Sequence, residues 1–214
     1  VLETVAGLGG ANRDKSVRLA CIQLIGNLVK RSAEMKLDTK TLQDLATDHL
    51  FPMLAEEHRL TRKATAEAYG EIARVLVPFK VVAQLVKNLN ETQRKKRICT
   101  GIALAVIAKK FKPWGVIPFI INEFQMCQST QAADVTQHAI LKTIRFMFEY
   151  LGPDGKDYVH HFIPLLERSL TERCMQHRRQ AIEAGRAMVL AVVNIDGNFE
   201  DIVIHLLNLT HPNI

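Results

Sequence analysis

The sequence predicts an all-α protein, a right-handed solenoid in which paired helices stack on one another. Apolar residues recur with helical periodicity along almost the whole chain, and no stretch alternates with period two for long enough to form a convincing strand. Hydrophobic residues make up 48% of the chain, which is enough to bury a continuous core. Aromatic residues make up only 6%, so small and aliphatic side chains must pack the helices closely.

Five segments carry the apolar stripe of a helix with one buried face. In the first, Val17, Cys21, Leu24 and Leu28 repeat at spacings of three and four residues. The same pattern returns in 64–76, 98–111, 139–151 and 181–193. We call these the B helices. Shorter apolar segments, the A helices, are expected between and after them at 42–54, 81–89, 116–124, 158–170 and 199–209.

A short signature aligns the starts of the B helices and shows the repeat. A basic or polar residue is followed two places later by a small one, in Arg18-Leu19-Ala20, Arg62-Lys63-Ala64, Arg97-Ile98-Cys99, Gln137-His138-Ala139 and Arg179-Gln180-Ala181. Successive signatures are about 35 to 45 residues apart, the period of two-helix HEAT and armadillo repeats. The small residue allows neighbouring helices to approach, and the polar residue is expected near the solvated edge.

Three prolines recur within the A helices, at Pro52, Pro118 and Pro164. A proline either kinks a helix or occupies its first turn, and the sequence leaves both readings open. The linkers between helices are short. Residues 1–214 are therefore interpreted as one repeat array, with about four complete helix pairs and partial repeats at both ends. Both ends look like cuts through a longer solenoid.

No pattern in the sequence predicts an enzyme or a cofactor. The phosphate-binding loop, the dinucleotide fingerprint, the zinc-protease helix motif and the serine nucleophile elbow are all missing. The four cysteines form no C-x-x-C pair and indicate a reducing compartment. His160 and His161 are adjacent, so their rings point to different sides of a helix and suit a metal badly. No apolar run reaches 18 residues, so no membrane span is expected.

Two basic clusters are the strongest indication of a binding function. The net charge is +6, and the clusters lie in 58–63 and 94–97, each at the start of a B helix. In a solenoid these starts share one edge, so the clusters are expected to form one basic ridge that binds phosphates. The alternative is a solvated rim that pairs with Glu56, Glu57 or Glu91.

At these same residues the sequence resembles the C-terminal HEAT region of the large subunit of the splicing factor 3b complex, with enough differences to indicate a divergent member. The resemblance runs in collinear order along the chain. Its motifs include Arg62-Lys63-Ala64-Thr65, Tyr69-Gly70-Glu71-Ile72-Ala73, Arg97-Ile98-Cys99-Thr100, Pro118-Phe119-Ile120-Ile121-Asn122-Glu123-Phe124, Phe148-Glu149-Tyr150-Leu151-Gly152 and Ile163-Pro164-Leu165-Leu166-Glu167.

The resemblance implies a nuclear, non-catalytic scaffold of the spliceosomal U2 small nuclear ribonucleoprotein. The family clamps the duplex of branch-site pre-mRNA and U2 RNA, and it holds the branch adenosine in a pocket shared with a small zinc-containing subunit of the same complex. Other subunits of the complex are implied partners, and splicing-modulator small molecules bind the pocket in some members.

Carried over to this sequence, the resemblance places the RNA and branch-adenosine pocket at Arg59, Arg62, Lys63, Ala66, Tyr69, Ile98 and Ile102. The phosphate-contacting ridge falls at Arg94, Lys95, Lys96 and Arg97. The family usually has valine at Ala66, Ile98 and Ile102, so the shape of the pocket is expected to differ and sensitivity to modulators stays open. The alternative function is a protein-interaction scaffold of the transport or phosphatase type, with the basic edge facing acidic peptides.

Overall fold

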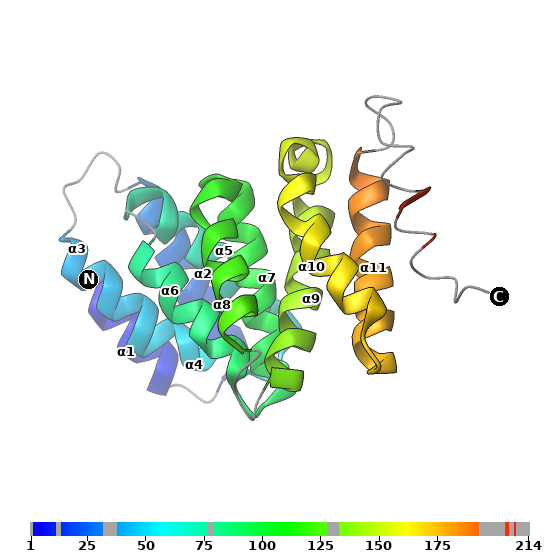
Figure 1. The fold of residues 1–214 in the computed structure, drawn as a ribbon. Helices are drawn as coiled ribbons and strands as arrows, with labels where there is room; N and C mark the ends of the chain where they lie inside the picture. The colour runs from blue at the N-terminus through cyan, green and yellow to red at the C-terminus, as the bar shows by residue number, and fades with distance from the viewer. Residues whose placement is uncertain are drawn as a thin grey trace.

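The computed structural model describes residues 2–11, 14–31, 38–76, 79–127 and 133–192, together with 204, 205 and 208. Every regular element in these residues is helical, which confirms the predicted all-α fold class (Figure 1). The predicted A helix at 199–209 lies outside the described residues except at 204, 205 and 208. None of the described helices is both long enough and apolar enough to cross a membrane.

The five B helices stand side by side in one row. They are α2 (Lys15–Arg31), α5 (Arg59–Val75), α7 (Arg94–Lys110), α9 (Ala133–Leu151) and α11 (Met175–Val192). Each contacts the next in chain order, and α2 and α11 lie toward opposite ends of the row (Figure 1). Neighbours run parallel, because successive contacts follow the same order along both helices. From α7 and the turn that precedes it to α9, these contacts are Asn90 with Thr136, Gly101 with Thr143 and Lys109 with Leu151. From α9 to α11 they are Asp134 with His177 and Arg145 with Glu183.

The A helices form a second layer over this row. They are α1 (Leu2–Ala11), α3 (Thr39–Asp44) continuing through a π-helical segment (Leu45–Leu50) into α4 (Phe51–Met53), α6 (Phe79–Lys87), α8 (Ile117–Cys127) and α10 (Val159–Thr171). A 3₁₀ turn follows α6 (Asn88–Asn90), and others precede α8 (Pro113–Gly115) and α10 (Gly152–Tyr158). In Figure 1, α6, α8 and α10 lie in front of α5, α7 and α9.

The core lies between the two layers and consists mainly of aliphatic residues, as the composition predicts. Small residues bring neighbouring B helices close together. A Cβ placed on Gly101 of α7 would lie 2.6 Å from the hydroxyl oxygen of Thr143 in α9, so these helices meet almost backbone to backbone. The three prolines differ in position. Pro118 lies in the first turn of α8, whereas Pro164 lies inside α10 and Pro52 lies near the end of the continuous helix from Thr39 to Met53, just after its π-helical segment.

The structure corrects the alignment of the last helix-start signature by one residue. In α2, α5 and α7 the first backbone hydrogen bond of the helix is donated by the N–H of an arginine. Arg18 donates to the carbonyl oxygen of Asp14, Arg62 to that of His58 and Arg97 to that of Gln93. In α11 the corresponding donor is Arg178, not the predicted Arg179. The sequence pattern chose Arg179 because it required a small residue two places later, which is Ala181.

Candidate nucleic-acid interface

The first basic cluster contains one arginine with a structural role and two exposed cations. The half-buried Arg62 donates from one guanidinium nitrogen to the carbonyl oxygens of Glu56 and Glu57, both at 2.6 Å. Arg59 and Lys63 are exposed on the first turns of α5. Burial raises the pKa of the Cys99 thiol in α7, and the nearby Arg62 guanidinium partly offsets this rise. Arg62 therefore lies between α5 and α7 and fixes the loop that leads into α5.

Arg97 and Arg178 repeat this arrangement on later B helices. Arg97 donates to the carbonyl oxygens of Glu91 and Thr92, at 2.6 and 2.8 Å, and Arg178 donates to that of Glu172 at 3.2 Å. A guanidinium with several fixed donors is well suited to such carbonyl capture. The recurring arginine thus stabilises the turn between an A and a B helix.

In the rest of the predicted ridge, one cation forms an ion pair and two are exposed without one in the described residues. Lys96 forms an ion pair with Glu91 at 3.8 Å, and its ammonium lies 5.2 Å from the ring centroid of Phe51. Arg94 and Lys95 are exposed. The alternative of a self-neutralised rim therefore describes Lys96, whereas Arg94 has no ion pair within the described residues.

The predicted adenosine slot is not a single open cavity in the described residues. Ala66 and Tyr69 are each only 2% exposed and pack in the core. The Tyr69 hydroxyl donates to the carbonyl oxygen of Ala46 at 2.6 Å, and burial raises its pKa far above the ordinary value. Ile98 and Ile102 are half-buried on α7, and Ile98 lines a different groove. Lys63 lines a separate cavity of about 510 Å³ between α2 and α5.

Tyr69 offers a test of whether this position serves the core or the RNA pocket that the resemblance predicts. The Tyr69→Phe substitution removes a buried donor and leaves the Ala46 carbonyl without that bond, so we expect the free energy of unfolding to fall by about 1–2 kcal/mol. Urea denaturation measures this loss. Because the hydroxyl faces the core, RNA affinity at a temperature where the variant is folded should equal that of the wild type. A large loss of RNA affinity with unchanged stability would instead assign Tyr69 to the interface.

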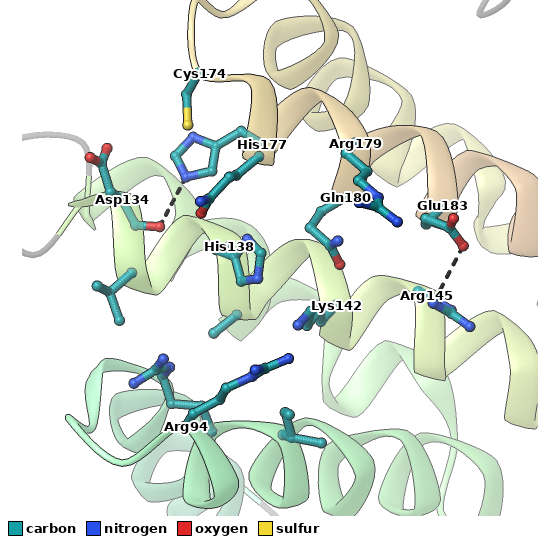
Figure 2. A pocket seen from close by; sticks show the side chains of 15 residues that line it. Arg94, Asp134, His138, Lys142, Arg145, Cys174, His177, Arg179, Gln180 and Glu183 are labelled. Atoms are coloured by element: carbon teal, nitrogen blue, oxygen red, sulfur yellow. Dashed lines mark hydrogen bonds and ion pairs between the residues drawn. The ribbon is translucent and has the colours of Figure 1, made fainter.

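A groove of about 700 Å³ lies between α7, α9 and α11 (Figure 2). Arg94 lies on its α7 side, His138 and Lys142 follow α9, and Arg179 lies on α11. Five arginine and lysine residues line it against two carboxylates, so its lining is cationic. These residues are Arg94, Arg97, Lys142, Arg145 and Arg179, with Asp134 and Glu183 as the acids.

The two histidines of the groove differ in their partners. His177 is buried, and its ring nitrogens contact the Glu172 carboxylate at 2.8 Å and the Asp134 carbonyl oxygen at 2.9 Å. The His138 ring lies 6.4 Å from that of His177, and its buried Nδ1 has no hydrogen-bond partner among the described residues. Within the described residues no group of histidine, cysteine or carboxylate side chains could hold a metal ion.

Burial and neighbouring positive charges lower the pKa values of two groups in the groove. Desolvation, followed by the positive charges of Lys142, His177, Arg97 and Arg94, lowers the pKa of His138 to about 4. Desolvation and the neighbouring arginines Arg94, Arg97 and Arg145 also lower the pKa of Lys142. The sequence pattern assigned His138 to a helix start and gave neither residue a binding role. Both lie on α9 (Ala133–Leu151), and only the apposition of α9 to α7 places them beside Arg94.

Two curated proteins are similar to this chain over most of its length, whereas no protein-family model matches it. One is U2 snRNP component prp10 of Schizosaccharomyces pombe, 31% identical over 203 residues, with 95% of this chain and 16% of that protein covered. Another is U2 snRNP component HSH155 of Saccharomyces cerevisiae, 33% identical over 203 residues, covering 77% of this chain and 21% of that protein. The chain spans less than a quarter of the length of either relative. It is a divergent member of the family of the large subunit of the splicing factor 3b complex.

Proposed function

We propose that this chain is a non-catalytic scaffold of the U2 snRNP in the nucleus. In this proposal it helps to clamp the duplex of branch-site pre-mRNA and U2 RNA and to form the branch-adenosine pocket. The small zinc-containing subunit and the other splicing factor 3b subunits are its proposed partners. Membership of a family whose two matched relatives are U2 snRNP components supports the assignment.

The proposed architecture is a right-handed HEAT solenoid, with residues 1–214 forming one array within a longer protein. Two features support it. The B helices form a parallel row beneath a layer of A helices, and an arginine recurs at the fourth position of four of the five B helices, at 18, 62, 97 and 178. Such a row places the N-termini of α5 and α7 on one edge, where their N–H groups favour anions.

The observation that carries the RNA proposal is the exposure of cations along this edge. Arg59 and Lys63 on α5, and Arg94 and Lys95 on α7, are exposed at the helix starts. Arginine and lysine that neutralise phosphates supply most of the affinity of a protein for a nucleic-acid backbone. The half-buried Ile98 and Ile102 remain the proposed apolar contacts for a lifted base, and the partner subunit would have to complete a slot around them.

Charge reversal at the exposed pair is the sharpest test, since Arg62 also fixes a loop. In the full-length protein assembled with the zinc-containing subunit, Arg59→Glu with Lys63→Glu should weaken binding to a branch-site duplex with a bulged adenosine by at least about tenfold. Fluorescence anisotropy at fixed low salt measures the affinity. The loss should shrink as salt is raised, because both substitutions act on phosphate contacts.

The matched control is Lys40→Glu with Lys80→Glu, which reverses two exposed lysines in the A layer. It changes the net charge by the same amount and should leave affinity within about twofold, because both lysines lie away from the B-helix edge. Equal affinities for the two double variants would contradict the proposed interface. Preference of the wild type for an acidic peptide over the bulged duplex would favour a protein-interaction scaffold instead.

A further inference from the structure

We propose that the groove between α7, α9 and α11 binds consecutive backbone phosphates of an RNA strand, through Arg94, Lys142 and Arg179. This inference deepens the proposed function and rests on it, because it extends the RNA interface from the starts of α5 and α7 across two further B helices. Neither α9 nor α11 belongs to the ridge that the sequence predicts.

The first reason is that several cationic side chains in the groove have no acidic partner in the described part of the chain. Arg94, Lys142 and Arg179 form no ion pair within the described part of the chain, although all three line one groove. Arg145 is different, because it pairs with Glu149 at 2.6 Å and with Glu183 at 3.4 Å. Three cations without an ion pair, from three successive helices, therefore line the same groove (Figure 2).

The second reason is that the positively charged groups in the groove lie close enough to repel one another, and a bound anion would relieve this repulsion. Desolvation and then the surrounding cations disfavour the charged forms of Lys142 and His138. Arg94 and Arg97 of α7 act on both residues from across the groove. A phosphate in the groove would screen these cations from one another.

The third reason is that few apolar residues line the groove. Ile98, Val135 and Ala139 are the only aliphatic residues that line the groove. A docked protein segment generally needs a buried apolar or aromatic anchor to bind specifically. A nucleic-acid backbone needs only spaced cations and hydrogen-bond donors, which the guanidinium groups and the amide of Gln180 provide. The chemistry of the groove therefore favours a phosphodiester chain over an acidic peptide.

Salt-dependent binding of a short fluorescein-labelled oligouridylate to the full-length protein tests this site. The probe has neither a duplex nor a bulged adenosine. Each phosphate contact contributes about 0.7 to the slope of log affinity against log salt for a single strand. Lys142→Gln and Arg179→Gln should each reduce the slope by about 0.7 and weaken binding severalfold at low salt, whereas Lys80→Gln on the A layer should change neither.

Thermal stability distinguishes a binding role of Lys142 from a structural one, because loss of a structural lysine would not raise the Tm. Because Lys142 lies among like charges, Lys142→Gln should raise the Tm at low salt while it weakens binding. Unchanged slopes in both Lys142→Gln and Arg179→Gln would overturn the proposal, as would binding of polyglutamate more tightly than oligouridylate. Loss of bulge preference in the duplex assay, with these slopes still reduced, would contradict the branch-adenosine function and leave the phosphate site intact.

Binding should also take up a proton at His138. The groups facing this ring are Lys142 on α9, His177 on α11, and Arg94 and Arg97 on α7. A bound phosphate should raise the pKa of His138 from about 4 toward its ordinary value, so affinity should increase from about pH 7.5 to about pH 5.5. The His138→Asn variant should lose this increase relative to the wild type. An equal increase in the variant would overturn the role of His138 in anion binding.

Discussion

Replacement of Phe148 by alanine is expected to lower the free energy of unfolding by about 3–5 kcal/mol. The Phe148 ring is fully buried in α9 and meets the ring of Phe162 in α10 edge to face, with centroids 5.7 Å apart. Gly155 packs directly on it, since a Cβ there would lie 2.9 Å from the ring. Truncation would leave a cavity beneath three elements that cannot all move inward. Urea denaturation should show a lower midpoint with an unchanged slope.

Phe79 supplies the matched control for this prediction. It also pairs with another ring, that of Phe119 at 6.0 Å, but 44% of its surface is exposed. Phe79→Ala therefore removes less buried area and leaves a site that water fills, so a loss of about 1 kcal/mol is expected. If the two alanine variants unfold at the same urea concentration, the packing assigned to Phe148 is incorrect.

Replacement of Gly101 by valine is expected to destabilise the protein by about 1–3 kcal/mol, because α7 and α9 leave no room for a side chain between them. The nearest atom to an added Cβ is the Thr143 hydroxyl oxygen at 2.6 Å. This hydroxyl also donates to the Ala139 carbonyl at 2.9 Å, so rotation away from the new methyl groups would break a buried hydrogen bond. Thermal unfolding followed by circular dichroism measures the loss.

Gly7 distinguishes the effect of crowding from that of helix propensity. It lies within α1, and a Cβ there would meet nothing within 4 Å. Gly7→Val should therefore change stability by no more than about 0.5 kcal/mol, since valine is slightly favoured over glycine in a helix. A similar loss in both variants would show that backbone propensity, and not the approach of α7 to α9, dominates at Gly101.

The sequence by itself determined the helical fold class and the segments that form the B helices. Their apolar stripes repeat every three to four residues, and this local period depends on no distant contact. Helix starts were less predictable. The described α5 begins at Arg59, several residues before the apolar range 64–76, because polar first turns carry no stripe. The two basic clusters were correctly predicted to lie at helix starts, since their positions follow from the same local pattern.

Only the tertiary structure decided which charges are free and where they meet. Arg62 and Lys63 are adjacent in sequence, yet one donates to loop carbonyls and the other is exposed. The family resemblance assigned Tyr69 to a pocket. In the structure its hydroxyl is buried against the A layer and donates a hydrogen bond to the carbonyl oxygen of Ala46. The cationic groove joins Arg94, Lys142 and Arg179, which lie on three helices and are 37 or more positions apart. No local period encodes this apposition, because it depends on loop lengths and on how closely small residues let the helices approach.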